Sequence, residues 1–587
     1  MLKWFAGKRK LARLVQRSFS IREEQNRIEV NEETEGEFEI DRTIKPDEGF
    51  FAADIDDDLK QSLKAEILED LEETLSRLPF HHFMPLEETE KIDFSGMKQV
   101  NLVSANEFEK IPALANKLDF VVQKPGIYRL SDMKNYIGEQ RYDFLKSIPQ
   151  PDQVDFSQIP PYNPPSTDTK LLDFARKQKC KYLMSTSTIS YFLSHLYYSL
   201  SFYKEPNFGN VGNFSQKERT RYMNAQKKPY TSFMKCLDKE KNLWAFDSDS
   251  GMFTPNHLIL IQMGKILERV YTMEPDHFNA TFIKDKQNLG LFPPVDDDYH
   301  RFMVLNDKIC LRSQIDCKTT MSDGKHVVFE IKSRALAPIR YDIFEWSKYL
   351  DYYIDPIYGE LHSYEREYYD LIRGAMLKYF FQLKIGQMDG AFVGYHNSRE
   401  NFGFEYVKMS TIEKLLFSST FKADMVFMLS TRIMSHLLDK IIDAIKSEEY
   451  EFVKIGYYSD PITQKFVTIV ELLNHDYLEF KNLVMDPIKG MENVVDYYGK
   501  VLGKKNLRAI KFETKLYPIL NGIHNPFFLH DLREGDVIDM EISTINCGYI
   551  SYEEYMHFLL SAYKYEYTLL DSKYMGNWLT QEKKYTL

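Results

Sequence analysis

The sequence predicts an α/β protein whose central part is a mixed sheet flanked by helices, with a helical region before it and an α/β region after it. One observation is a helical pattern over residues 255–271 that is followed by strand patterns at 299–305, 309–317 and 326–333. A second is the return to a helix at 375–387 and a strand at 391–396. The chain has 587 residues, of which 43% are hydrophobic, enough for a few domains.

The helix expected at 255–271 opens with Thr254 as N-cap and Pro255 at the first helical position. Apolar residues recur every three or four positions, so one face should meet the core: Ile259, Met263, Ile266, Leu267 and Val270. Glu268 lies beside this apolar stripe. A helical Glu three residues after a Lys, here Lys265, is in most proteins a surface ion pair.

The strand at 326–333 places Glu330 and Lys332 on one face, because side chains two residues apart in a strand point the same way. If the preceding turn consists of the three residues 322–324, hairpin register brings Asp316 opposite Glu330 on that face. A two-residue turn would place Asp316 on the other face unless a bulge intervened. Two carboxylates can bind a divalent cation, and a Lys beside them can orient water or stabilise negative charge during phosphodiester hydrolysis.

Further along the chain, Gln382 on the helix at 375–387 could reach a site at the edge of the sheet, although a surface Gln near a helix end is equally common. The C-terminal third reads as α/β from its pattern alone. Its expected elements are a helix at 421–447, strands at 451–458 and 465–471, a helix at 475–502, strands at 507–516 and 535–545, and a final helix from Tyr552.

The N-terminus is expected to be a mitochondrial presequence over residues 1–19, because residues 1–20 hold six basic and no acidic residues among apolar ones. The run Arg17-Ser18-Phe19-Ser20 resembles a matrix-protease site with cleavage after Phe19; a basic surface helix is the alternative. Residues 20–90 read as an acidic disordered linker, with 23 acidic against 7 basic residues over 21–90. The net charge of this segment is -16 and that of residues 1–20 is +6, so only -2 of the formal charge of -12 remains for residues 91–587, and nucleic acid is not excluded as a partner.

Residues 91–250 are expected to form a helical, basic N-terminal region that includes a Pro-rich arm at 148–165, with six prolines in 18 residues. Between Lys170 and Tyr230 there are 11 basic and three acidic residues, interleaved with aromatic ones. Lys217, Arg219 and Arg221 are the expected phosphate contacts, since basic groups neutralise phosphates while aromatic rings stack on bases of single strands. A solvated face over an aromatic core is an equally good interpretation.

Cysteine and hydropathy patterns exclude several classes of protein. The five cysteines include no CxxC pair, which argues against a disulfide framework, a zinc site and an iron–sulfur cluster. No apolar run is long enough to span a membrane, so any membrane association is expected to be peripheral.

The order and spacing of Glu268, Asp316 and Glu330-Ile331-Lys332 resemble the motif of the PD-(D/E)XK nuclease superfamily. Longer runs resemble the fungal mitochondrial 5′-to-3′ exoribonuclease family, first identified through nuclear "petite" mutants. The resemblance covers about residues 155–415, and its runs are KYLMSTS at 181–187, LRSQIDC at 311–317, EIKSRA at 330–335, IGQMDGAFV at 385–393 and YHN at 395–397.

The resemblance implies a PD-(D/E)XK restriction-endonuclease-like core at 251–420, followed by the α/β region at 421–587. It implies a mitochondrial exoribonuclease, of the matrix or associated with the inner membrane, that uses Mg2+ or Mn2+ and processes or degrades single-stranded RNA. Asp316 and Glu330 would hold the metal, Glu268 would be a ligand or position water, and Lys332 would orient the water. Gln382, Arg334 and Arg340 are further candidates, either for contacts with substrate phosphate or for supporting the site. Mitochondrial RNA polymerase or RNA decay machinery are the partner proteins it suggests.

Two departures from the superfamily pattern are visible. Ile315 stands where the superfamily has Pro, and Glu330 stands where the family usually has Asp. Neither removes a metal-binding carboxylate. Two alternatives remain open: a mitochondrial DNA exonuclease on the same core, and a non-catalytic RNA-binding scaffold. A scaffold has no use for two converging carboxylates near RNA phosphates.

Overall fold

The computed structural model describes residues 88–92, 101–102, 108–209, 211–214, 222–249, 255–295, 299–447, 450–473 and 507–563. The chain divides into two compact units, Met1–Pro79 and Phe80–Leu587, and the described residues belong to the second. Several predictions therefore lie outside the described residues. They are the presequence, almost all of the acidic linker, the helix at 475–502, and Lys217, Arg219 and Arg221.

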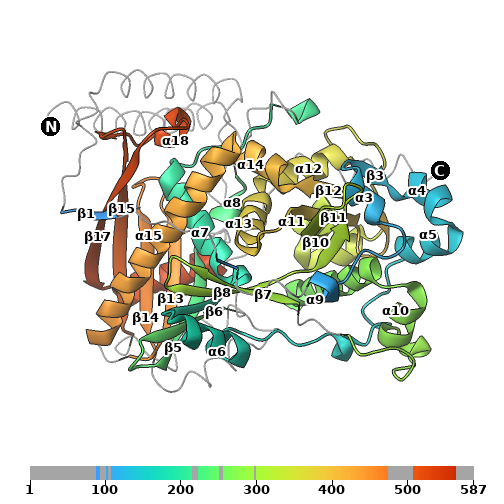
Figure 1. The fold of residues 1–587 in the computed structure, drawn as a ribbon, viewed down its shortest axis with the longest axis horizontal. Helices are drawn as coiled ribbons and strands as arrows, with labels where there is room; N and C mark the ends of the chain where they lie inside the picture. The colour runs from blue at the N-terminus through green and yellow to red at the C-terminus, as the bar shows by residue number, and fades with distance from the viewer. Residues whose placement is uncertain are drawn as a thin grey trace, which may run out of the picture. The chain divides into compact units, whose positions relative to one another are not determined.

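A 12-stranded sheet draws strands from all three regions expected at 91–250, 251–420 and 421–587 (Figure 1). Strand β4 is parallel to both of its neighbours, and the other pairs are antiparallel. In spatial order the strands are β1 (Glu90–Ile92), β17 (Ile538–Tyr549), β15 (Ala509–Leu520), β14 (Phe466–Leu472), β13 (Phe452–Ser459), β5 (Tyr230–Asp238), β6 (Leu243–Ser248), β4 (Tyr182–Ser185), β8 (Ile309–Gln314), β7 (His300–Leu305) and β2 (Asn101–Leu102), with β16 (Ile523–His524) paired to β15.

Helices cover both faces of this sheet. Alternate residues of β4 and β8 belong to different hydrophobic clusters, because successive strand side chains point to opposite faces. The face of Tyr182 and Leu311 packs against α7 (Thr186–Ser201), which also contacts α15 (Thr420–Ser447), and the opposite face packs against α6 (Thr169–Gln178). Thirteen residues of the aromatic-rich helix α7 are buried, so it forms part of the core.

A separate five-stranded sheet forms the centre of the expected nuclease core. Its order is β3 (Ile127–Arg129), β12 (Asn401–Lys408), β11 (Gly390–His396), β10 (His326–Ala335) and β9 (Cys317–Thr320), with β10 and β11 parallel and the other pairs antiparallel. Helix α9 (Pro255–Thr272) packs on the face of Phe329 and Ile331. Helix α13 (Met376–Gly386) belongs to the core on the other face, where Val328 and Val393 lie. The expected mixed sheet flanked by helices is confirmed.

The single strand expected at 309–317 is divided in two by the structure. Strand β8 ends at Gln314 in the large sheet, and β9 begins at Cys317 in the small one. The Ile315 amide donates to the Tyr299 carbonyl oxygen at 2.9 Å, after which the chain leaves the large sheet. The expected hairpin register is nevertheless correct, since β9 and β10 pair Cys317 with Phe329 and Thr320 with His326.

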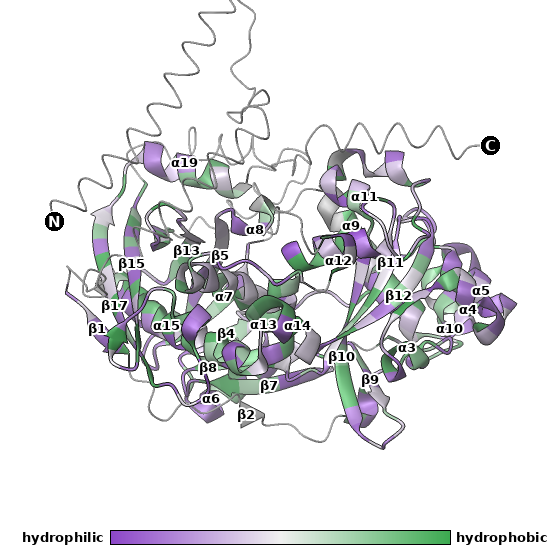
Figure 2. Ribbon diagram, turned by 90° about the horizontal axis from the view of Figure 1, so that it is seen from above, coloured by the Kyte–Doolittle hydropathy of each residue, from purple (hydrophilic) through white to green (hydrophobic). Residues whose placement is uncertain are grey.

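Most other expected elements are present within a few residues of their predicted bounds: α15, β13, β14, β15, β17 and α19 (Tyr552–Tyr563). Hydrophobic residues concentrate on β10 and α13, whereas α4 and α5 are largely hydrophilic (Figure 2). The remaining helices are α3 (Asp119–Gln123), α4 (Leu130–Ile137), α5 (Glu139–Lys146), α8 (Asn224–Lys227), α10 (Pro275–Phe282), α11 (Ala337–Tyr341), α12 (Tyr364–Arg373), α14 (Met409–Phe417) and α18 (Phe528–Asp531), with 3-10 turns η2 (Phe108–Lys110), η3 (Phe156–Gln158), η4 (Gly212–Phe214), η6 (Lys284–Lys286) and η7 (Ile343–Tyr349).

The Pro-rich arm packs along the molecule rather than standing apart from it. The Ile148 amide donates to the Arg399 carbonyl oxygen at 2.9 Å, and Val154 forms an isolated bridge with Ile283. At its far end, Arg312 of β8 donates to the Asn163 carbonyl oxygen. Among the described helices, none combines the length and the apolar composition needed to cross a lipid bilayer.

Candidate active site

An open strand edge in the small sheet creates the candidate site. Strand β9 pairs with β10 only as far as Phe329, while β10 continues to Ala335 beside β11. The amide of Ile331 therefore has no neighbouring strand to accept its hydrogen bond, and the Asp316 Oδ2 accepts it at 2.9 Å. A buried amide needs such an acceptor. Because β9 does not pair with β10 beyond Phe329, the Ile331 amide is free to hold the Asp316 side chain beside β10.

Glu330 and Lys332 lie on the face of β10 that meets the core of α13. The Lys332 ammonium donates to Glu330 Oε1, and its Nζ lies 5.3 Å from the centre of the Tyr379 ring on α13. The side chains of Lys332 and Glu330 are only 21% and 12% exposed. The structure therefore brings the carboxylates and the ammonium together, as the predicted hairpin register requires.

Glu268 reaches the same group of charges from α9. One turn before Glu268, α9 packs closely against β10 at Gly264, where a Cβ atom would lie 3.1 Å from the Ser333 hydroxyl oxygen. The Thr272 hydroxyl donates to the backbone carbonyl oxygen of Glu268 at 2.8 Å. Its electrostatic neighbours include Lys265, Lys332 and Glu330.

Burial and the closeness of these charges shift the pKa values of the site residues. Burial raises the pKa of Asp316 well above its usual range, and the charges of Glu330 and Glu268 raise it further. Burial also raises the pKa of Glu268, against the opposing effects of Lys265 and Lys332. Burial disfavours the Lys332 ammonium, but Glu330 and Asp316 outweigh it, so the pKa of Lys332 is raised. Lys332 is therefore a cation at neutral pH and suits a donor role rather than that of a general base.

The side chains fit a hard divalent cation by their chemistry. Asp316, Glu330 and Glu268 offer only carboxylate oxygens, the ligands that Mg2+ and Mn2+ prefer. A bound cation would relieve the repulsion through which Glu330 and Glu268 raise the pKa of Asp316. Within the described parts of the chain, no three His, Cys, Asp or Glu side chains already converge as an assembled metal site. In the structure the Glu330 carboxylate accepts a hydrogen bond from the Lys332 ammonium.

Helix α13 faces the site with two polar side chains. Gln382 is 7% exposed, and its Oε1 is buried with no hydrogen-bond partner within the described residues. Tyr379 lies one helical turn before Gln382 and contacts Lys332. The sequence did not single out Tyr379, although its spacing of three residues from Gln382 on a predicted helix was a signal that could have found it.

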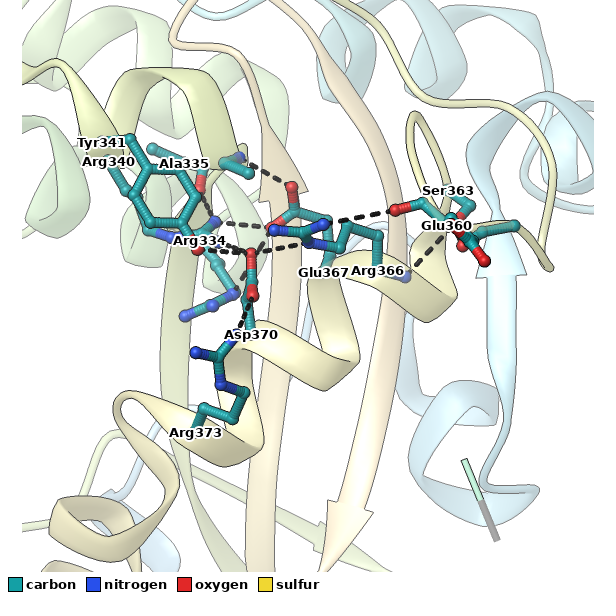
Figure 3. A network of polar contacts seen from close by, with 12 residues as sticks. Arg334, Ala335, Arg340, Tyr341, Glu360, Ser363, Arg366, Glu367, Asp370 and Arg373 are labelled. Atoms are coloured by element: carbon teal, nitrogen blue, oxygen red, sulfur yellow. Dashed lines mark hydrogen bonds and ion pairs between the residues drawn. The ribbon is translucent and has the colours of Figure 1, made fainter. Parts of the chain in front are cut away.

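Arg334 and Arg340 lie in a buried ion-pair network (Figure 3). The Arg334 Nε is 3.7 Å from Glu367 Oε2, and Arg340 Nη1 donates to the same oxygen at 2.5 Å. Asp370 is surrounded by Arg340, Arg366 and Arg373. Glu367 and Asp370 were not foreseen, because both pair with arginines about 30 positions earlier in the chain, although Asp370 also pairs with Arg366 and Arg373 of its own helix.

Sequence comparisons connect the chain to mitochondrial proteins. Residues 162–439 match the family model described as mitochondrial protein Pet127. A Schizosaccharomyces pombe protein named mRNA degradation protein pet127, mitochondrial, is 27% identical over 447 residues, which cover 74% of this chain and 80% of that protein. Saccharomyces cerevisiae PET127, named as a candidate component of the mitochondrial translation system, is 33% identical over 262 residues, which cover 43% of this chain and 30% of that protein.

Two solved structures resemble the chain at low similarity. Kluyveromyces lactis Dxo1, crystallised in complex with manganese, has 11% identity and a TM-score of 0.30, covering 64% of this chain and 90% of that one. Scheffersomyces stipitis Rai1 has 13% identity and a TM-score of 0.31, covering 72% and 98%. Similarity at this level carries no conclusion about the chemistry of this chain.

Proposed function

We propose that this chain is a mitochondrial, metal-dependent exoribonuclease that hydrolyses phosphodiester bonds of single-stranded RNA from the 5′ end, in transcript maturation and degradation. The observation that carries the proposal is the placing of Asp316, Glu330 and Lys332 together on one edge of β10. The name of the S. pombe relative supports RNA degradation as the process, and the Pet127 family description supports mitochondria as the location.

Each residue of the site has a distinct task in this proposal. Asp316 and Glu330 hold the cation, and Glu268 acts as a further ligand or positions water. A bound Mg2+ or Mn2+ would supply Lewis acidity and a lower pKa for water. Lys332 orients the attacking water and stabilises the negative charge that develops on the phosphate. Gln382, with its buried and unpartnered oxygen, can accept a hydrogen bond from a bound water or a ribose hydroxyl.

The proposal is tested by incubating purified protein with RNA or DNA labelled at either end, with Mg2+, Mn2+ or EDTA. We expect release of labelled nucleotide from 5′-labelled RNA only when metal is present. Preferential digestion of DNA would support the alternative of a DNA exonuclease. Binding of RNA with no digestion under any of these conditions would support a non-catalytic scaffold instead.

Location and partners follow from the same proposal. The presequence would direct the chain to the matrix, where RNA polymerase or RNA decay machinery are candidate partners, and membrane association would be peripheral. Cleavage after Phe19 would leave Ser20 as the mature N-terminus.

A further inference from the structure

The Lys332 ammonium has two different partners at the candidate site. It donates a hydrogen bond to the Glu330 carboxylate, and it lies 5.3 Å from the centre of the Tyr379 ring on α13. A cation within about 6 Å of the centre of an aromatic ring is attracted by the negative charge of the ring face. Glu330 is a proposed metal ligand, whereas Tyr379 is not. The two contacts of Lys332 should therefore respond differently to a bound metal.

The Glu330 carboxylate would have to serve both Lys332 and a divalent cation. Its negative charge is then shared with the metal, and the ammonium and the metal repel each other. Asp316, the other carboxylate whose charge acts on Lys332, is a proposed ligand as well. Both attractions that hold the ammonium in the metal-free protein are thus weakened. The Tyr379 ring offers no ligand to a hard cation, so its attraction for the ammonium remains.

The core around α13 holds the Tyr379 ring in place. The ring is partly buried and packs against the hydrophobic core. On the same helix, Leu377, Phe380 and Phe381 are at most 1% exposed. Phe380 also contacts the rings of Phe381 and Phe417. A ring on such an anchored helix can fix the end of a long, flexible lysine side chain.

We propose that Tyr379 is a positioning residue whose ring holds the Lys332 ammonium at the site when a divalent cation binds the Glu330 carboxylate. The inference rests on the proposed function, in which Lys332 orients the attacking water. Without the ring, the ammonium would lose a contact that it keeps in the metal-bound protein, and it could turn into solvent, since its side chain is 21% exposed. Metal binding would then be weaker and the water less often oriented.

The first test is a double-mutant cycle on Mn2+ affinity, measured by calorimetry without RNA. Tyr379→Leu should raise the Kd for Mn2+ about fivefold, the effect of one cation–π interaction at a partly buried site. In a Lys332→Ala background the same substitution should change the Kd by less than about twofold, because the ring then has no ammonium to hold. Equal changes in both backgrounds, or no change in either, would overturn the inference.

The second test separates kcat from KM in RNA cleavage at saturating Mn2+. Tyr379→Leu should lower kcat about 5- to 30-fold and leave KM for RNA within about twofold, because the ring acts on Lys332 and not on RNA. Tyr379→Phe should keep the wild-type kcat, since it keeps the ring. An equal loss of kcat in the Leu and Phe variants would overturn the inference.

The matched control for both tests is Tyr191→Leu. The Tyr191 ring on α7 is also partly buried and lies 4.4 Å from an ammonium, but that ammonium belongs to Lys378. The control should keep the Mn2+ affinity and kcat of the wild-type chain. Losses as large as those of Tyr379→Leu would indicate a general effect of packing around α13 and overturn the inference.

A further variant decides the matter if Tyr379→Leu does not fold. Pentafluorophenylalanine at position 379 keeps a ring of similar size but makes its face positive, so the ring should repel the Lys332 ammonium. The Kd for Mn2+ should rise as in Tyr379→Leu, and an unchanged Kd would overturn the inference.

Failure of the inference and failure of the proposed function give different results. A wild-type chain that binds Mn2+ but digests no RNA would overturn the proposed function, while the Mn2+ cycle would still decide the role of Tyr379. A wild-type chain that digests RNA but shows no coupling between Tyr379 and Lys332 would overturn the inference alone. Failure of the wild-type chain to bind Mn2+ would overturn both.

Discussion

Replacing Asp316 by Asn should stabilise the metal-free protein while abolishing cleavage. The amide oxygen of Asn can still accept the Ile331 hydrogen bond that Asp316 accepts at 2.9 Å. The substitution removes repulsion from Glu330 and Glu268 and loses attraction to Lys332, a net loss of about one like-charge interaction. At an effective dielectric constant near 20, one such interaction at roughly 8 Å amounts to about 2 kcal/mol. We therefore expect about 1–2 kcal/mol of added stability.

The pH dependence of this gain follows from the pKa of Asp316. Burial and the neighbouring carboxylates raise that pKa in the folded protein above its unfolded value of about 3.9. The folded state then binds the proton more tightly than the unfolded state. The wild-type protein therefore loses stability as pH rises from about 4 toward the folded pKa. The advantage of Asp316→Asn should be present at pH 7 and disappear as pH falls toward 4.

Thermal unfolding with EDTA or Mn2+, combined with RNA cleavage, measures each of these effects. Wild-type protein should gain about 2.7 kcal/mol of stability at a Mn2+ concentration 100 times its Kd, and Asp316→Asn should gain much less. The matched control is Asp389→Asn, since Asp389 also accepts a β10 amide, that of Val328 at 3.1 Å, but is paired with Lys325. The control should lose up to about 1 kcal/mol and keep cleavage.

Two results would refute this reasoning. If metal-free Asp316→Asn is less stable than the wild-type chain at pH 7, the carboxylates do not repel one another as described. If the variant digests RNA at the wild-type rate, Asp316 is not a metal ligand. Lys332→Ala should separate the roles further, because it removes a cation: Mn2+ should bind at least as tightly, while cleavage is lost. A strong loss of Mn2+ affinity in a folded Lys332→Ala variant would contradict its assignment.

Three further predictions concern other parts of the chain. The N-terminus of matrix protein should lie at or near Ser20, and N-terminal mass spectrometry that finds Met1 retained would contradict the presequence. Replacing the three basic residues of the 217–221 run by Ala should weaken RNA affinity and reduce the slope of its salt dependence; an unchanged slope would make the run an ordinary surface. Burial raises the pKa of Glu405 to about 7, although Tyr395 donates a hydrogen bond to its carboxylate, so the wild-type protein should lose up to about 3 kcal/mol of stability as pH rises from 4 to 7. Glu405→Gln should remove this pH dependence. Urea unfolding at several pH values measures the effect, and an unchanged profile in the variant would contradict the prediction.

Local patterns were sufficient for the elements that surround the site. Local patterns identified α9 and α13, and alternation gave the register of β9 and β10 under one of the two turn lengths left open, the three-residue turn that the structure has. These features depend on residues close in sequence, whose helix and strand periods are fixed by backbone geometry. Glu268 could be proposed because α9 is a regular helix, but its contribution depends on how α9 packs against β10.

The sequence by itself determined the helices and most strands of the core and the face of β10 that bears Glu330 and Lys332, whereas the turn that sets the register of Asp316 stayed open between two and three residues until the structure showed three. Only the tertiary structure decided that β8 and β9 belong to different sheets, that β10 has an open edge at Ile331, and that Arg334 faces Glu367 on α12. The physical reason is that periodicity reports which way a side chain points along its own element. Its partner across a sheet or on another helix is set by packing between segments distant in the chain, where burial decides which charges must pair.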